Sequence, residues 1–352
     1  MEVSGKWNND LMIKQLQTCR DIIAQNPDSI YKTDVEVLKR LLKNTNTFFE
    51  QSDIFIEKIK DDIDACSMFN DFIIAITNFS CLDEYLPQED IYISELVYPE
   101  SLLFELIYEF YTGLNQEIKD LFIGVFAQRH NNVQFSDTRS YNSFLPGLRY
   151  SYINIEKDNS IIDFENAVHE YAHSIADLMC YRVDSYSSYP FTELFPIFMS
   201  FLFLDYVDDA LENIHDEVRV LKVINARNMT GYATTIRDFY TFLKLIDDTK
   251  LLETKKAFIN NMSKMLEIKM GKVAQILETS ILEQFSYTIP YLTAIELYYI
   301  WKEDNVLALS ILKKLQTMPD SNNYYEELQK LGINLNEHGK EYILNITKPH
   351  GM

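Results

Sequence analysis

Glycine and proline are scarce in this sequence, with 9 of each among 352 residues. So few helix-breaking and turn-forming residues argue against a sandwich of many short strands and favour long helices. No apolar run is long enough to cross a bilayer, because Pro196 and Ser200 interrupt the most apolar stretch, residues 194–204. The N-terminal residues also lack the basic start and apolar segment of a signal peptide, so we expect none.

Cysteine is also rare, and its spacing matches no known framework. The four residues Cys19, Cys66, Cys81 and Cys180 include no C-x-x-C pair. This spacing fits neither a zinc knuckle nor a set of disulfides. Scattered cysteines in a long chain predict reduced thiols and a cytoplasmic location.

Basic residues are in deficit. The chain has 32 Lys and Arg against 53 Asp and Glu, which gives a net charge of −21. A negative field repels phosphate groups, so we expect neither nucleic acid nor a membrane as a partner. The charge would suit cationic peptides and metal ions, or it could serve solubility alone.

The residues that are abundant predict a packed, mainly α protein. Hydrophobic residues make up 47% of the chain, and its length predicts about two domains. Apolar residues recur at helical spacing before residue 130, as in Val35, Leu38 and Leu41. Residues 150–155 predict a short strand, and helical patterns resume at Ser160. We therefore predict an N-terminal helical lobe over 1–140 and a mostly helical lobe over 141–352.

One motif carries specific chemistry. The segment His169–His173 has the sequence H-E-x-x-H. Residues 160–180 contain no Gly or Pro, and Ser160 followed by Asp163 is typical of a helix start. On a helix, residues four apart share one face, so His169 and His173 could bind one ion.

A catalytic zinc ion needs a third protein ligand and one open position for water. The later histidines are distant, so a carboxylate is the alternative. Glu193 lies 24 residues after His169 and is the only acid between Tyr189 and Leu204. Burying it is costly unless it is paired or binds metal, although it could also be a helix N-terminal charge. Glu170 is the candidate general base, and such a site hydrolyses amides.

The motif, together with residues 191–194 and 204–206, resembles the thimet oligopeptidase and oligoendopeptidase F family of zinc peptidases. In that family H-E-x-G-H is followed some two dozen residues later by a helix that bears a Glu ligand. The resemblance covers about residues 145–335. It implies a helical, two-lobed, zincin-like peptidase with a small β element at the cleft edge. It also implies one zinc ion per chain, bound by His169, His173 and Glu193, with Glu170 as the base for oligopeptide hydrolysis.

The same resemblance implies further site residues. The segment 152–155 is similar to the family's cleft-edge strand, which makes Tyr152 and Asn154 candidate substrate contacts. Segment 285–294 is similar to a tyrosine-rich segment of the family, in which one tyrosine donates a hydrogen bond to the oxyanion. Tyr287 is the first choice there and Tyr291 the second, with core packing as the alternative.

The loop between the predicted ligand helices supplies two more candidates. Tyr186 and Tyr189 could contact substrate side chains, or they could belong to an ordinary polar connection.

The sequence also departs from the family pattern. Ala172 replaces a Gly, Pro196 and Ser200 replace residues that are commonly Ser and Glu, and no His lies between His215 and His338. The N-terminal half is shorter than in family members. Three functions therefore stay open: a peptidase that cleaves oligopeptides, a weakened relative that only binds peptides, and a processing protease or toxin with one dedicated protein target.

Overall fold

The computed structural model describes residues 7–43, 70–87, 98–158, 160–182, 191–211, 214–244, 281–318 and 324–348. The chain forms two compact units, and each unit is assembled from separate stretches of sequence. Unit 1 comprises 1–50, 90–221 and 300–320, and unit 2 comprises 51–89, 222–299 and 321–352. The sequence-based division, by contrast, is a single boundary near residue 140.

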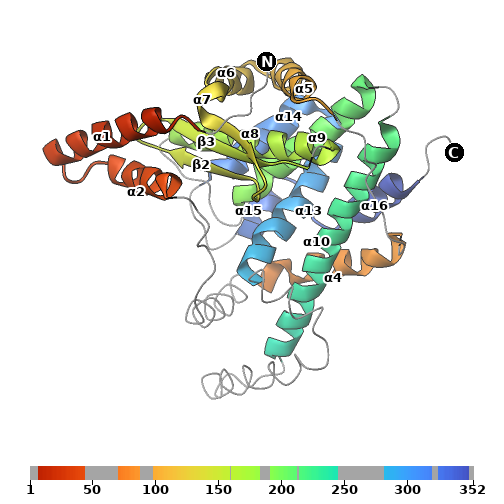
Figure 1. The fold of residues 1–352 in the computed structure, drawn as a ribbon. Coiled ribbons are helices and arrows are strands. Elements are labelled where there is room, and N and C mark those ends of the chain that lie inside the picture. Colours follow the sequence, from red (N-terminus) through yellow and green to blue (C-terminus); the bar gives the residue numbers. More distant parts are fainter. Residues whose placement is uncertain are drawn as a thin grey trace, which may run out of the picture. The chain divides into compact units, whose positions relative to one another are not determined.

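Helices dominate both units, which confirms the predicted mainly α fold with a small β element (Figure 1). Those of unit 1 are α1 (Asn9–Gln25), α2 (Tyr31–Leu42), α5 (Glu100–Gly113), α6 (Gln116–Phe126), α7 (Arg129–Asn132), α8 (Ile161–Arg182), the 3-10 helix η3 (Phe191–Glu193), α9 (Leu194–Ala210) and α14 (Asn305–Gln316). Several of them begin with a side-chain cap. Asn8, Asn115 and Asp304 each accept a hydrogen bond from a backbone N–H of the first turn.

Unit 2 contains η1 (Asn70–Phe72), α4 (Ile73–Ser80), η2 (Cys81–Tyr85), α15 (Tyr324–Lys330) and α16 (Gly339–Thr347). Two long helices, α10 (His215–Lys244) and α13 (Ile281–Glu303), contribute residues to both units. In the described part of the chain, none of the helices combines the length and apolar character that a membrane span requires.

A three-stranded sheet belongs to unit 1. Its strands β1 (Val133–Ser136), β2 (Tyr141–Leu145) and β3 (Tyr150–Glu156) lie in the order β1-β3-β2. β3 is parallel to β1 and antiparallel to β2. The predicted strand is therefore present, but both of its edges are already paired. β1 pairs with residues 153–156 and β2 with residues 150–154, so β3 is the central strand of the sheet and not the edge strand that the resemblance implied.

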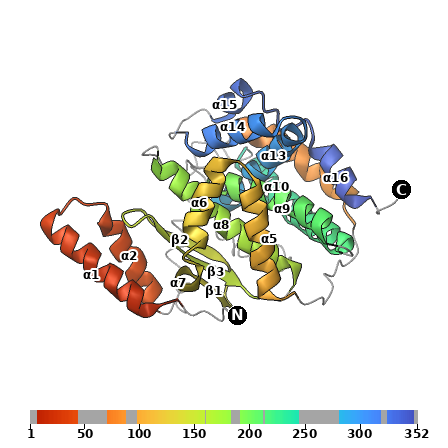
Figure 2. The ribbon, with the colours of Figure 1, turned by 90° about the horizontal axis from the view of Figure 1, so that it is seen from above.

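The antiparallel pair α1 and α2 packs beside the sheet (Figures 1 and 2). Its apolar faces form one cluster with β2 and β3, which includes Met12, Leu38 and Leu145. The hydroxyl of Tyr152 donates to Gln15 of α1 at 2.6 Å. The N-terminal helices are thus joined to the sheet next to α8.

A buried carboxylate ties α2 to the turn between β2 and β3. Asp34 is fully buried and accepts hydrogen bonds from the backbone N–H groups of Gly147 at 3.1 Å and Leu148 at 3.0 Å. A Cβ atom at Gly147 would lie 2.6 Å from the ring of Tyr31 and 2.7 Å from the Asp34 carboxylate. Only glycine therefore fits at this position of the turn.

Replacing Asp34 with asparagine should destabilise the protein by about 1–3 kcal/mol, because the amide offers one acceptor oxygen to two buried N–H donors. Burial raises the pKa of Asp34 above its ordinary value of 3.8, although both N–H groups lower it. The folded state then holds this proton more tightly than the unfolded chain, so the Asp34 contribution to stability falls as pH rises from 3.8 through the raised pKa. Urea unfolding at several pH values measures both effects.

The matched control is Asp21→Asn, because Asp21 is exposed on α1. It should leave the free energy of unfolding within about 0.5 kcal/mol of the parent. An Asp34→Asn variant as stable as this control would contradict the assigned role of Asp34.

Candidate metal centre

The H-E-x-x-H segment lies in the middle of α8, as its apolar surroundings predict. Phe164, Ala167, Val168 and Ile175 are all buried along this helix. The hydroxyl of Tyr111 in α5 donates to the carbonyl of Val168 at 2.8 Å. The turn that carries the motif is thus packed into the centre of unit 1.

Side chains also fix the start of α8. The hydroxyl of Ser160 accepts a hydrogen bond from the N–H of Ile162, and Asp163 accepts one from the N–H of Asp158 at 2.7 Å. The first contact satisfies an N–H group that the first turn would otherwise leave unpaired, and the second ties the segment before the helix to that turn. The predicted helix start is therefore present.

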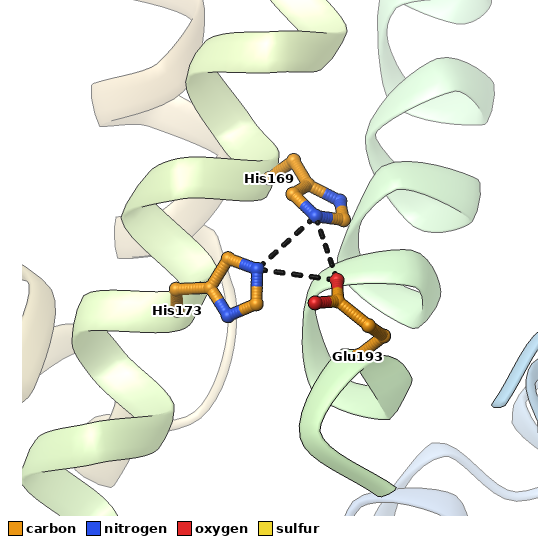
Figure 3. A group of neighbouring side chains, drawn as sticks. All are labelled: His169, His173 and Glu193. Atoms are coloured by element: carbon orange, nitrogen blue, oxygen red, sulfur yellow. Dashed lines mark hydrogen bonds and ion pairs between the residues drawn. The ribbon is translucent and has the colours of Figure 1, made fainter. Parts of the chain in front are cut away.

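Glu193 ends η3 and directly precedes α9, which packs along α8. Pro196 is in the first turn of α9, where its missing N–H has no intrahelical partner to lose. The Glu193 side chain makes no capping hydrogen bond to its own helix. Its carboxylate instead faces the two histidines of α8 (Figure 3).

Three donor atoms converge at this point (Figure 3). The Nε2 atoms of His169 and His173 are 3.2 Å apart. Glu193 Oε2 lies 3.1 Å from the first and 3.2 Å from the second. This spacing would let a single zinc ion be held by all three residues. The side chains keep 22%, 22% and 15% exposure, so one side of the group remains accessible.

The electrostatics of the group favour a cation. Burial acts to raise the pKa of Glu193, but the neighbouring rings of His173 and His169 bring it well below its ordinary value of 4.5. Burial acts to lower the pKa of His173, yet the Glu193 carboxylate raises it to about 9. The negative charge that draws a proton to His173 would equally draw a divalent ion.

Glu170 is almost fully buried next to His169, with 6% exposure. Burial raises the pKa of its carboxyl group, and the charges of His173, His169 and Arg139 oppose that rise. Within the described residues, its Oε2 atom has no hydrogen-bond partner. A buried carboxylate oxygen without a partner beside the donor triangle suits a proton acceptor for a water molecule held there.

The donor set fits zinc. Two imidazole nitrogens, one carboxylate oxygen and one accessible side match the three-ligand arrangement of catalytic zinc sites. A second group in unit 2 contains Glu296, Glu337 and His338. There Glu296 accepts hydrogen bonds from the backbone N–H of His338 at 3.0 Å and pairs with its ring at 2.6 Å. Those contacts anchor the start of α16, which accounts for the buried acid without a metal.

The predicted substrate contacts of β3 lie inside the protein. Tyr152 has no exposed surface, and its hydroxyl is bonded to Gln15. Asn154 is fully buried as well, and its amide donates to the carbonyls of Thr138 and Arg139 while its oxygen accepts from Ser136. Both side chains hold the sheet and its β1–β2 loop together, so they offer no surface to a peptide.

Four predicted tyrosines remain. Tyr186 and Tyr189 are outside the described residues. Tyr287 and Tyr291 belong to the unit 2 part of α13. Tyr291 is 3% exposed and packs against Phe79 and another ring, whereas Tyr287 is partly exposed.

Sequence reasoning missed a polar network beside His173. The amide of Asn142 in β2 donates to Asp177 Oδ2 at 3.0 Å, and its oxygen accepts from the Ser174 hydroxyl at 3.0 Å. Asp177 follows His173 by four residues, a spacing that could have marked it as a neighbour on the same helical face. Nothing in the sequence pointed to Asn142.

Comparisons with known proteins place the fold. No protein-family model matches the sequence, and no curated protein does either. Among solved structures, PZ peptidase A with an inhibitor matches with a TM-score of 0.53 and 12% identity, over 89% of this chain and 59% of that one. The chain has the fold of PZ peptidase A. The resemblance inferred from the motif is thus confirmed as a likeness of fold.

Three further matches have TM-scores below 0.5. A structure described as an oligoendopeptidase F from Bacillus anthracis matches with a TM-score of 0.48 and 10% identity, over 94% of this chain and 60% of that one. A peptidase from Chlamydophila abortus matches with a TM-score of 0.45 and 14% identity, over 96% of this chain and 61% of that one. The chain thus spans about six-tenths of the length of the structures it matches.

Proposed function

We propose that this protein is a zinc-dependent peptidase that hydrolyses peptide bonds of oligopeptides. The observation that carries the proposal is the convergence of His169, His173 and Glu193, whose donor atoms lie 3.1–3.2 Å apart. Glu170 adds a buried carboxylate at the next position of α8. The fold shared with PZ peptidase A supports a peptidase over an unrelated metal protein.

The chemistry follows from the roles of the residues. Bound zinc would lower the pKa of its water and polarise the scissile carbonyl. Glu170 would accept one proton from the attacking water as the new C–O bond forms. It would then deliver that proton to the amide nitrogen as the C–N bond breaks, so one water is consumed per bond cleaved. Burial raises the pKa of Glu170, which brings the carboxyl closer to the neutral range where both transfers are efficient.

A tyrosine of α13 is proposed to stabilise the oxyanion. Tyr287→Phe should lower kcat by about 10²–10³-fold, because it removes a hydrogen bond made in the transition state. Tyr291→Phe tests the second candidate in the same assay, and we expect a smaller effect because its ring packs in the interior of unit 2. Steady-state kinetics on a fluorogenic peptide compare the two. Equal rates for Tyr287→Phe and the parent would remove Tyr287 from the mechanism.

Digestion of a peptide library, followed by mass spectrometry, tests the function as a whole. We expect cleavage of many short peptides by the full chain loaded with zinc, and no cleavage after chelation. Peptide binding without any cleavage would favour the weakened relative. Silence on the library combined with cleavage of one protein would favour a dedicated processing protease.

A further inference from the structure

Helix α8 has two neighbours and presents different side chains to each of them. Its two histidines, His169 and His173, face Glu193 at the start of α9 (Figure 3). Ser174 bonds to β2 instead, because its hydroxyl donates to the amide oxygen of Asn142 at 3.0 Å. Successive residues of a helix point about 100° apart, so the metal ligands and the contact with the sheet occupy different sides of the same turn.

Asn142 joins this turn of α8 to the sheet through both ends of its amide. Its oxygen accepts from the hydroxyl of Ser174, a residue with no exposed surface, and its Nδ2 group donates to Asp177 Oδ2 at 3.0 Å. Ser174 and Asp177 are three residues apart, so the amide spans one turn of the helix. Hydrogen bonds have a preferred direction. The two bonds therefore fix the rotation and the height of α8 against β2 more closely than apolar packing alone would.

The strand that carries Asn142 is itself held firmly. All five residues of β2 are paired with the central strand β3. The loop that leads into β2 is fixed as well, because the amide of Asn154 in β3 donates to the carbonyls of Thr138 and Arg139. Asn142 therefore ties α8 to a fixed part of the sheet.

The proposed general base lies one turn before this tie. Ser174 follows Glu170 by four residues, and its Oγ atom is 3.4 Å from the Glu170 carbonyl oxygen. Within the described residues, no hydrogen bond fixes the Oε2 atom of Glu170. Bound zinc would hold the three donor residues in place, but Glu170 is not one of them. The direction of its carboxylate therefore depends on how α8 is set against the sheet.

We propose that Asn142 is a positioning residue that holds α8 against β2 and so aligns the Glu170 carboxylate with the water at the metal centre. This inference rests on the proposed function, because it assigns how the base of that reaction is held. In this role the effect of Asn142 on the rate passes through the backbone of α8. The sheet thereby contributes to catalysis through a residue that lies outside the H-E-x-x-H motif.

Steady-state kinetics of the zinc-saturated full chain test the assignment. Asn142→Ala removes both hydrogen bonds and should lower kcat by about 10–100-fold, because a small misplacement of a catalytic group is costly. KM and zinc affinity should stay at their parental values, since the substitution alters neither a proposed substrate contact nor a ligand. Asn131→Ala, at an exposed residue of α7, is the matched control and should keep the parental kcat.

An exchange of the two partners separates positioning from a general loss of packing. In the double variant Asn142→Asp/Asp177→Asn, the carboxylate at position 142 can accept from both the Ser174 hydroxyl and the amide at position 177. Both hydrogen bonds are then restored with one of them reversed, so kcat should return toward the parental value. Ser174→Ala deletes only one of the two bonds and should lower kcat by a smaller factor than Asn142→Ala. Circular dichroism verifies that each variant is folded.

Folded Asn142→Ala with the parental kcat would overturn the positioning role. A loss of zinc affinity as large as the loss of kcat, or a double variant as slow as Asn142→Ala, would overturn it as well. If Asn142→Ala does not fold, Ser174→Ala takes its place in the same comparison. A parent that binds no zinc or cleaves no peptide would instead refute the proposed function.

Discussion

Replacing Glu170 with glutamine is expected to lower kcat by about 10²–10⁴-fold while one zinc ion per chain is retained. Glutamine has nearly the same shape, so it should fit the buried position next to His169. Its amide cannot take a proton from water near neutral pH. Glu170 is not among the three converging donor residues, so the metal should stay bound. Peptide hydrolysis and elemental analysis of the same sample measure the two quantities.

The control for this change is Glu105→Gln, because Glu105 is exposed on α5. It should have parental activity and parental zinc content. Circular dichroism and thermal unfolding verify that both variants are folded. A folded Glu170→Gln variant that is as active as the parent would eliminate Glu170 as the base, whatever the zinc content.

Replacing Glu193 with glutamine should remove most of the zinc affinity. The amide keeps an oxygen donor but loses the negative charge, which faces both histidines at 3.1–3.2 Å. Removal of an outer-shell partner weakens metal binding by about 10–100-fold, and we expect Glu193→Gln to weaken zinc binding by more than that. Hydrolysis should disappear with the metal, in contrast to Glu170→Gln, in which only the rate falls.

Thermal unfolding provides a second measure of this change. A ligand at 100 times its Kd stabilises the folded state by about 2.7 kcal/mol. The parent should therefore unfold at a higher temperature when zinc is added, and Glu193→Gln should not respond at the same zinc concentration. Glu156→Gln, at the exposed end of β3, should behave like the parent. Tight binding of one zinc by Glu193→Gln would show that the third ligand lies elsewhere.

The local features of the centre could be predicted from the sequence because they depend on helical spacing. His169 and His173 are one turn apart, and the helix around them follows from its apolar neighbours. Glu193 stood out as a lone acid in an apolar stretch, and the structure brings its carboxylate to the histidines. Both inferences use information within about two dozen residues.

The place of β3 in the sheet could not be predicted in the same way. Whether a strand is central or at an edge depends on which strands pair with it, and β1 and β2 lie in a polar stretch with little periodicity that did not mark them as strands. Residues 150–155 of β3 are buried without alternation, which is typical of a strand covered on both faces. This burial excludes Tyr152 and Asn154 as peptide contacts. It could not be read from the sequence, because aromatic and polar side chains are also typical of an exposed strand.

Long-range polar contacts were the other feature that the sequence did not reveal. Asp34 meets the β2–β3 turn across 113 residues, and Asn142 meets Asp177 across 35. Each pair involves ordinary polar residues in unremarkable surroundings, so only the folded chain identifies them. The interleaved composition of the two units is non-local for the same reason.

X-ray absorption at the zinc edge of the zinc-loaded parent tests the central claim most directly. The account predicts two imidazole nitrogens at about 2.0–2.1 Å, with carboxylate and water oxygens at about 2.0–2.2 Å. One of the imidazole contributions should be lost in His173→Ala. A shell of sulfur at about 2.3 Å, or a zinc ion with no imidazole ligand, would contradict it.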